Sequence, residues 1–144
     1  MVKAVDLASP GDVIVVDAQG MDVAVWGELA TLSAIKRGVK AVVIDGGIRD
    51  ADDILELGFP LWSRTVTPNA GEPHGHGRLQ ELIACAGQPV NPGDIVVADE
   101  IGVVVVPRDM AYEIYRKAVE VSQKEKRYKK GIAEGKTLSE IFGL

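Results

Sequence analysis

Two short segments of this chain carry residue types that could bind a metal ion and an anion. The first is Gly27-Glu28-Leu29-Ala30, and the second is Asp45-Gly46-Gly47-Ile48-Arg49-Asp50. Each is expected where a strand or loop passes into a helix, and the backbone N–H groups at such a junction attract anions. Two carboxylates and one guanidinium brought together there would hold a divalent metal ion and a small anionic substrate.

The charged side chains of the second segment have distinct expected roles. Arg49 can grip a carboxylate or an enolate with two parallel N–H groups. Asp50 offers a hard oxygen ligand suited to Mg²⁺ or Mn²⁺, and Asp53, one helical turn later, could contribute through a water molecule. An alternative stays open, in which Asp50 and Asp53 only complement the dipole of a helix.

The first segment also opens a helix, so its free N–H groups suit a substrate carboxylate. Glu28 could bind a metal-bound water, although an acidic residue is also an ordinary helix start. His74 and His76 are interpreted as part of a solvent-facing loop, because alternate residues in a flexible loop rarely form a metal site alone. Cys85 lies in an apolar run and is expected to be a buried, inert thiol.

Composition predicts one globular domain spanning residues 1–144, with 47% hydrophobic and 26% charged residues. The net charge of −5 argues against a nucleic-acid partner. No apolar run approaches the length needed to span a membrane. A single cysteine excludes a disulfide within the chain, which fits a cytoplasmic protein.

Strand and helix patterns alternate along the chain, which predicts an α/β fold. A Pro-Gly-Asp turn at 10–12 recurs at 92–94, and each copy leads into an apolar strand. The glycines at 46 and 47 are expected to form a tight turn between a strand and a helix. The predicted strands are 12–18, 40–44, 61–66, 82–86, 95–98 and 103–106, and the predicted helices are 28–37, 50–57, 108–130 and 137–142. The helix at 28–37 carries an apolar stripe of Leu29, Leu32, Ala34 and Ile35, and Thr137 with Glu140 has the form of a capping box.

Several motifs together resemble one family. The runs at 26–31, 41–50, 59–64 and 92–99 are similar to the 4-hydroxy-4-methyl-2-oxoglutarate aldolase family, which also contains the regulator of ribonuclease activity A. The resemblance covers nearly the whole chain. It implies a β/β/α swivelling-domain core with a long C-terminal helix, assembled as a homotrimer or hexamer with the site between subunits.

The resemblance also implies a class II aldolase that uses Mg²⁺ or Mn²⁺ and acts on small 2-oxo acids. Such an enzyme cleaves its substrate to pyruvate and decarboxylates oxaloacetate. Gly27, Glu28, Leu29 and Ala30 match the segment whose amides hold the pyruvyl carboxylate. The remaining matches are Arg49 to the residue that steadies the enolate, Asp50 to the direct metal ligand, and Glu125 to an acidic residue that reaches a neighbouring subunit's metal shell.

Two other functions stay open beside the enzyme. One is a non-catalytic regulator that binds a ribonuclease, and the other is an inactive, shortened relative that only assembles. The chain is expected to lack an N-terminal segment that typical members have. Regulators tend to end soon after the last strand, whereas this chain continues through a helix that bears Glu125, which favours the enzyme.

Overall fold

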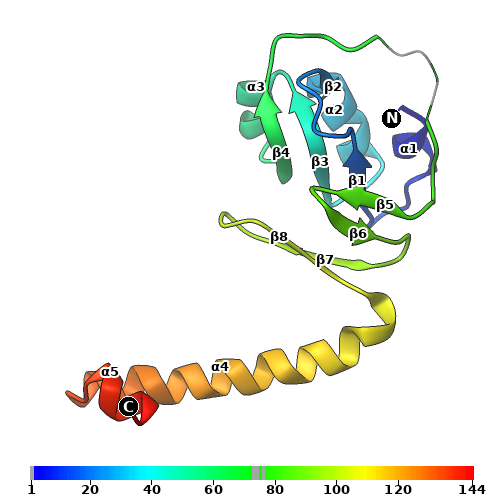
Figure 1. Ribbon diagram of the computed structural model, residues 1–144. Helices are drawn as coiled ribbons and strands as arrows, with labels where there is room; N and C mark the ends of the chain where they lie inside the picture. Colours follow the sequence, from blue (N-terminus) through cyan, green and yellow to red (C-terminus); the bar gives the residue numbers. More distant parts are fainter. Residues whose placement is uncertain (1, 73–74, 76) are drawn as a thin grey trace. The chain divides into compact units, whose positions relative to one another are not determined.

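The computed structural model describes residues 2–72, 75 and 77–144 and divides the chain into two compact units (Figure 1). The first unit spans Met1–Val105 and the second spans Val106–Leu144. His74 and His76 lie outside the described residues, so the expectation for their loop stays a prediction. The expectation of one domain over residues 1–144 likewise stays a prediction.

The first unit is built around a parallel sheet whose central strand is β3 (Ala41–Ile48). Strand β1 (Val13–Asp17) pairs with the first part of β3, and β2 (Ala24–Trp26) pairs with its last two residues. Strand β4 (Leu61–Val66) also pairs with β3 in parallel. Because β3 is paired on both sides and is buried almost throughout, its residues other than Asp45 are apolar side chains or glycine rather than an alternation of apolar and polar residues.

Helices cover one face of this sheet and small antiparallel strands cover the other, which confirms the β/β/α core. The helices are α1 (Val2–Leu7), α2 (Glu28–Lys36) and α3 (Ala51–Glu56). Alternate residues of β3 point to opposite faces of the sheet. Val42 and Ile44 pack in the core on the helix side, and Val43 packs in the core on the side of the antiparallel strands. The helix-side core also contains Val5, Ile14, Trp26, Ala34, Val39, Ile48, Ile54 and Phe59.

The opposite face is covered by two hairpins. Strands β5 (Ile83–Cys85) and β6 (Gln88–Val90) form the first, and β7 (Ile95–Ala98) and β8 (Val103–Val106) form the second. The two Pro-Gly-Asp turns have matching geometry. In each, the aspartate accepts a hydrogen bond from a backbone N–H three residues earlier at 2.8 Å, and its own N–H donates back at 3.1 Å. The repeated sequence therefore does build two similar corners.

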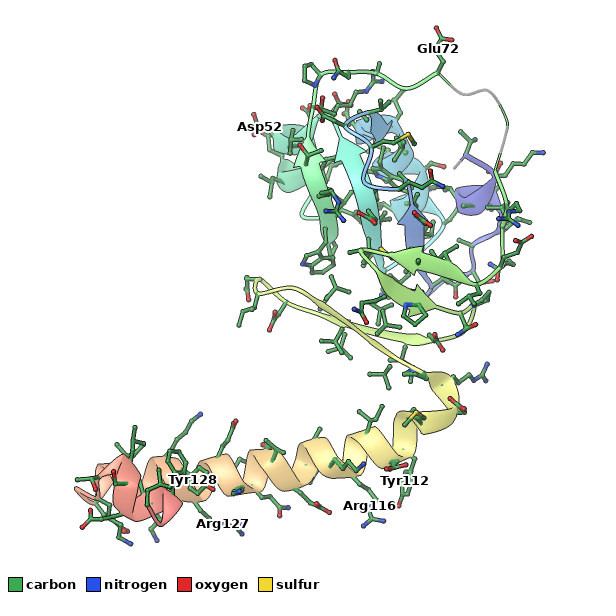
Figure 2. All side chains as sticks on the ribbon, in the orientation of Figure 1. Asp52, Glu72, Tyr112, Arg116, Arg127 and Tyr128 are labelled. Carbon is green, nitrogen blue, oxygen red and sulfur yellow. The ribbon has the colours of Figure 1, made fainter. Side chains whose placement is uncertain are left out.

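The second unit is helical. A 3₁₀ turn η1 (Arg108–Met110) leads into α4 (Ala111–Ala133), and α5 (Leu138–Phe142) follows. Thr137 and Glu140 form the predicted capping box at the start of α5, and Tyr128 meets Phe142 edge to face at 5.2 Å. Tyr112 and Arg116 project from α4 into solvent (Figure 2). No helix within the described residues is long and apolar enough to cross a membrane.

The structure differs from two expectations about the first unit. Residues 46 and 47 do not form a tight turn, because β3 continues through both to Ile48. The apolar stripe predicted on α2 is buried only in part, since Ala34 is buried whereas Leu29, Leu32 and Ile35 are exposed. The buried side of α2 is formed by small side chains, Thr31 and Ala34, which lets the helix lie close to the sheet.

Candidate functional site

Arg49 and Asp50 follow directly after β3, at the carboxyl end of the central strand. Asp50 has φ 56° and ψ 40°, a left-handed conformation that few residues other than glycine adopt, and it is the N-cap residue of α3. This backbone bend reverses the chain and directs the Asp50 side chain towards the start of α2. A strained position of this kind is typical of functional sites.

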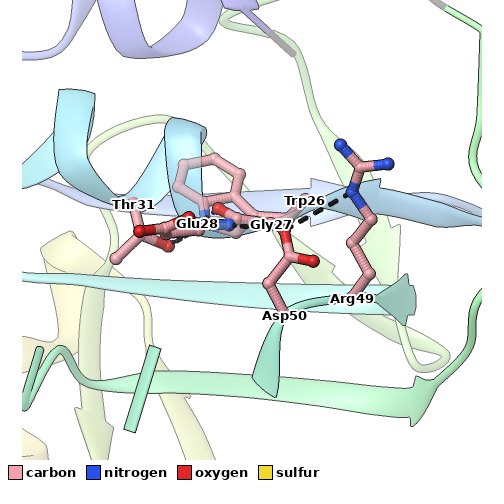
Figure 3. A network of polar contacts seen from close by, with 6 residues as sticks. All are labelled: Trp26, Gly27, Glu28, Thr31, Arg49 and Asp50. Carbon is pink, nitrogen blue, oxygen red and sulfur yellow. Dashed lines mark hydrogen bonds and ion pairs between the residues drawn. The ribbon is translucent and has the colours of Figure 1, made fainter. Parts of the chain in front are cut away.

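The start of α2 meets Asp50 directly (Figure 3). Asp50 Oδ2 accepts a hydrogen bond from the Glu28 N–H at 3.0 Å and lies 3.5 Å from Arg49 Nε. The Arg49 N–H donates to the carbonyl oxygen of Trp26 at 3.0 Å. The predicted meeting of the two segments is therefore present, on one edge of one sheet.

Gly27 favours this arrangement for a steric reason. A Cβ atom at position 27 would lie 2.5 Å from Asp50 Oδ2, closer than real Cβ atoms approach, and 3.1 Å from Arg49 Cγ, which is a tight contact. A larger residue at position 27 would displace the Asp50 carboxylate from its hydrogen bond with the Glu28 N–H. The glycine before Glu28 therefore serves close approach, since its φ of −163° is ordinary extended backbone.

Two buried polar side chains fix the position of the helix start. Trp26 Nε1 donates to Thr31 Oγ1 at 2.8 Å, and Thr31 Oγ1 donates to the Gly27 carbonyl oxygen at 3.0 Å. Trp26 is 2% exposed and Thr31 is fully buried. Hydrogen bonds between buried groups are costly to break, so they hold Gly27 and Glu28 in register with the end of β3.

The two glycines of β3 also serve close packing. A Cβ on Gly46 would lie 2.6 Å from the Ala18 Cβ, and one on Gly47 would lie 2.8 Å from both Thr67 Cγ2 and the Val23 carbonyl oxygen. The loops that follow β1 and β4 can therefore pass against the end of β3.

A pocket of about 470 Å³ adjoins this junction. Gly27, Leu29 and Ala30 line it from the start of α2, and Arg49 lines it from the end of β3. All four belong to the residues that the sequence singled out. No residue within the described part of the chain accepts a hydrogen bond from the Leu29 or Ala30 N–H, so both amides remain available to an anion.

Two further residues were predicted for the metal site. Asp53 lies exposed on α3, and no hydrogen bond or ion pair joins its side chain to Asp50. Glu125 is exposed and belongs to α4 of the second unit. Among the described residues, no group of three or more His, Cys, Asp or Glu side chains gathers to hold a metal ion. The proposed ligation by Asp53 and Glu125 stays a prediction.

The donor set at the junction nevertheless fits Mg²⁺. Asp50 uses Oδ2 for Glu28 and Arg49, and among the described residues no hydrogen bond or ion pair involves its Oδ1. The side chain as a whole is 34% exposed. Mg²⁺ usually keeps several waters and takes only one or two carboxylates from the protein, which is the arrangement that a single available oxygen provides.

Asp45 forms a second aspartate–arginine pair that sequence reasoning did not single out. Its Oδ1 accepts from Arg64 Nε at 2.6 Å and its Oδ2 accepts from the Ala86 N–H at 2.8 Å. The hydrogen bond from Arg64, and then that from Ala86, lower the pKa of Asp45 below its ordinary value. The sequence did contain a signal for this pair, because Asp45 lies within an apolar strand and a buried carboxylate requires hydrogen-bond partners.

Comparisons with known proteins agree with this geometry. A family model described as RraA-like, Aldolase/RraA, matches residues 1–105. An uncharacterized protein of Methanocaldococcus jannaschii is 41% identical over 85% of this chain and 59% of its own length. A protein of Halalkalibacterium halodurans named "Putative 4-hydroxy-4-methyl-2-oxoglutarate aldolase" is 39% identical over 82% of this chain and 57% of its own. The chain thus spans less than two thirds of the length of these relatives.

Solved structures show the same relationship. An uncharacterized protein from Pseudomonas syringae pv. tomato superposes with a TM-score of 0.85 at 34% identity, covering 94% of this chain and 69% of that one. Streptomyces coelicolor RraAS2, described as an unusual member of the RNase ES inhibitor RraA protein family, gives 0.82 at 34% identity, covering 88% and 66%. The resemblance seen in the sequence is confirmed, and the chain belongs to the RraA-like aldolase family.

Proposed function

We propose that this protein is a divalent-metal-dependent carbon–carbon lyase that acts on small 2-oxo acids. The proposed reactions are cleavage of 4-hydroxy-4-methyl-2-oxoglutarate to pyruvate and decarboxylation of oxaloacetate. The observation that supports this most directly is the contact of Asp50 Oδ2 with the Glu28 N–H, because it brings an anion-binding helix start beside a carboxylate and a guanidinium.

The start of α2 would bind the carboxylate of the substrate. The Leu29 and Ala30 N–H groups have no acceptor among the described residues, and Arg49 lies on the same pocket. Backbone N–H groups at a helix start favour an anion through both hydrogen bonding and the helix dipole. The substrate would thereby be held with its 2-oxo group near Asp50.

Both reactions share one difficulty, which is the negative charge that develops on a pyruvate enolate. Arg49 can place two N–H donors on this oxygen. Removing one fixed donor of this kind lowers the rate of a reaction by roughly a hundredfold or more. Among the motif residues at the junction no lysine is available to form a Schiff base. The side chains therefore favour enolate stabilisation by charge.

Mg²⁺ or Mn²⁺, when bound, would supply Lewis-acid polarisation of the 2-oxo group. Asp50 Oδ1 is the ligand that the chain offers for it, while Oδ2 stays engaged with Glu28 and Arg49. The same carboxylate thus orients the guanidinium and offers the metal ligand. We further propose that water serves as the proton donor.

The test is pyruvate release from oxaloacetate and from 4-hydroxy-4-methyl-2-oxoglutarate by the full chain, with and without added Mg²⁺ or Mn²⁺. We expect turnover that chelation abolishes and that metal restores. Asp52→Asn is a matched control, because Asp52 projects from α3 into solvent and removing its charge leaves the junction intact (Figure 2). No pyruvate with any metal or oxo acid would overturn the enzyme and favour the regulator that binds a ribonuclease.

We also propose that the protein assembles as a homotrimer or hexamer. Leu29, Leu32 and Ile35 form an exposed apolar stripe on α2, 75%, 42% and 42% exposed, and monomers seldom leave such stripes uncovered. Light scattering at micromolar concentration should give a mass of three or six chains. A monomer would contradict this, and Leu32→Glu should shift the mass downwards, whereas Leu138→Glu on α5 should not.

A further inference from the structure

A buried chain of hydrogen bonds, the relay, lies behind the junction (Figure 3). It consists of the Trp26 indole, the Thr31 hydroxyl and the peptide group between Gly27 and Glu28, and it ends on the Asp50 carboxylate. We propose that Thr31 is a positioning residue, which fixes the direction of the Asp50 carboxylate and thereby the oxygen that is left for a metal ion. This proposal rests on the proposed lyase function and concerns the control of the same site.

The donors and acceptors of the relay leave the Thr31 hydroxyl only one orientation. An indole N–H can only donate, so the Trp26 Nε1–H takes a lone pair of Thr31 Oγ1, at 2.8 Å. A carbonyl oxygen can only accept, so the hydroxyl proton points to the Gly27 oxygen, at 3.0 Å. A threonine that bonds back to the carbonyl four residues earlier is an ordinary feature of helices. Here, however, a buried tryptophan sets the direction of its hydroxyl.

The Gly27 carbonyl and the Glu28 N–H belong to the same planar peptide group, so bonds at its two ends fix its orientation. The oxygen accepts from Thr31 Oγ1 at 3.0 Å and from the Thr31 N–H at 3.1 Å. The nitrogen donates to Asp50 Oδ2 at 3.0 Å. Hydrogen bonds in series polarise one another, so the bonds at the oxygen also strengthen the N–H as a donor. The Thr31 hydroxyl thus acts on Asp50 through one rigid unit.

The Asp50 carboxylate has little else to hold it. Among the described residues, the Glu28 N–H is the one hydrogen-bond donor to this carboxylate, and Arg49 Nε lies 3.5 Å away. The Arg49 side chain is 49% exposed, so solvent weakens that ion pair. Because Glu28 engages Oδ2, Oδ1 is the oxygen left for a metal ion. Removing the partner that orients a metal-binding carboxylate costs roughly ten- to a hundredfold in metal affinity.

The relay does not depend on what covers the outer surface of the junction. Trp26 is 2% exposed and Thr31 is 0% exposed, whereas the residues that line the adjoining pocket include exposed ones such as Leu29. The hydrogen bonds of the relay therefore form within one chain, whichever surface lies against α2. Burial also means that solvent water does not take the place of a lost hydroxyl, so its removal should be felt in full.

Two substitutions separate the hydroxyl from the packing around it. Thr31→Val keeps the shape of the side chain and loses the hydroxyl, whereas Thr31→Ser keeps the hydroxyl and loses a methyl group. Both variants should be less stable than the parent, because the first leaves the Trp26 indole N–H unpaired and the second leaves a cavity. Only Thr31→Val should release Asp50, so the effect on Asp50 should follow the hydroxyl and not the stability.

The first measurement is hydrogen exchange of the Glu28 amide, followed by NMR on the full chain without metal. The Val42 amide, which donates to the Pro60 carbonyl at 3.1 Å, reports opening of the sheet and serves as the reference. Relative to Val42, exchange at Glu28 should be at least about tenfold faster in Thr31→Val and in Asp50→Ala, and within about twofold of the parent in Thr31→Ser. An unchanged ratio in Thr31→Val, or an equal rise in Thr31→Ser, would overturn the proposal.

Two further variants test the path of the effect. Ala34→Gly lowers stability on the same buried side of α2 without touching the relay, so it should leave the ratio of Glu28 to Val42 exchange unchanged. Thr31→Val added to Asp50→Ala should raise the ratio no further, because both remove the same restraint. A rise in Ala34→Gly as large as that in Thr31→Val, or full additivity in the double variant, would also overturn the proposal.

The second measurement is the affinity of the protein for Mn²⁺ alone, followed by the electron paramagnetic resonance signal of the free ion. The dissociation constant should be about tenfold higher in Thr31→Val than in the parent, and Thr31→Ser should restore it. Equal constants in parent and Thr31→Val would overturn the positioning role. A parent that binds no Mn²⁺ would instead overturn the metal-dependent lyase, and exchange at Glu28 would still decide whether Thr31 positions Asp50.

Discussion

Two aspartate–arginine pairs are formed by Asp45 within β3 and by Asp50 just after it, and they differ in burial, distance and hydrogen bonding. The Asp45 side chain is 8% exposed and lies 2.6 Å from Arg64 Nε, whereas the Asp50 side chain is 34% exposed and lies 3.5 Å from Arg49 Nε. Asp45 has both oxygens engaged, by Arg64 and by the Ala86 N–H. Asp50 has one oxygen engaged and one available.

This difference indicates that the Asp45–Arg64 pair has a structural role, whereas the Asp50–Arg49 pair is suited to binding a ligand. A buried carboxylate with a partner on each oxygen fastens the central strand to β4 and to the turn of the first hairpin. A half-exposed carboxylate in a left-handed backbone conformation, beside a loosely paired guanidinium, has an oxygen left for a ligand. Proximity of aspartate and arginine alone would not distinguish them.

The largest expected effect is on turnover at the exposed pair. Asp50→Ala should reduce metal-dependent pyruvate release by more than about a thousandfold, because the metal ion loses its one carboxylate and Arg49 loses its orienting partner. Thermal unfolding should change little. Asp52→Ala on the same helix is the control. Retention of turnover by Asp50→Ala would place the metal site elsewhere.

The second effect compares the two arginines under the same substitution. Arg49→Lys keeps its charge but loses the planar pair of donors, so kcat should fall roughly a hundredfold. Arg64→Lys should leave kcat within a few-fold of the parent and should lower the melting temperature instead, since Arg64 serves Asp45. The comparison would break if Arg64→Lys lost more turnover than Arg49→Lys.

The third effect is on stability at the buried pair. Asp45→Asn keeps an acceptor oxygen but loses the charge that pairs with Arg64, which should lower the free energy of unfolding by about 1–3 kcal/mol at pH 7. Urea unfolding measures this loss. Asp12→Asn, at an exposed turn, should have a smaller effect.

The stability at this pair should also depend on pH with a definite sign. The pKa of Asp45 is lowered by folding, so its contribution is present above the unfolded pKa and is lost as pH falls through the lower folded pKa. The stability gap between the parent and Asp45→Asn should therefore shrink as pH drops below about 4. A gap that widens with acid would contradict the assignment.

The sequence predicted the regular elements well where local pattern and packing agree. The strands at 61–66, 95–98 and 103–106 match, and the capping box at Thr137 is present. The short strand β6 contains Pro89 and has only three residues, so it carries no periodic signal. Helix α1 was also unexpected, since six residues with one buried side chain make a weak helical pattern.

The junction was predictable in outline and not in its contacts. The meeting of Gly27-Glu28 with Arg49-Asp50 followed from strand-to-helix spacing. Gly27 leaves room for the Asp50 carboxylate, and Gly46 and Gly47 leave room for neighbouring loops. These roles depend on distances between segments that are far apart in the chain. The role of Asp45 was missed for the same reason, because Arg64 and Ala86 are its partners only after folding.

The smallest expected effect concerns Cys85, which lies close to the buried pair. Burial raises the pKa of the Cys85 thiol, and the negative charges of Asp45 and Asp17 raise it further. Only the thiolate reacts with iodoacetamide. Alkylation of the folded protein at pH 8 should therefore be much slower than in urea, as the interpretation of a buried, inert thiol requires.

Asp45→Asn should also shift this reaction. Removing one nearby negative charge lowers the pKa of Cys85, so the midpoint of the alkylation rate against pH should move to lower pH. Opening of the fold moves the midpoint in the same direction, towards that of the unfolded chain, so the rate of each variant is compared with its own free energy of unfolding, measured in urea. Asp52→Asn should leave the midpoint unchanged. If Asp50→Asn moved the midpoint as far as Asp45→Asn, the two pairs would share one electrostatic environment, and the distinction between them would fail.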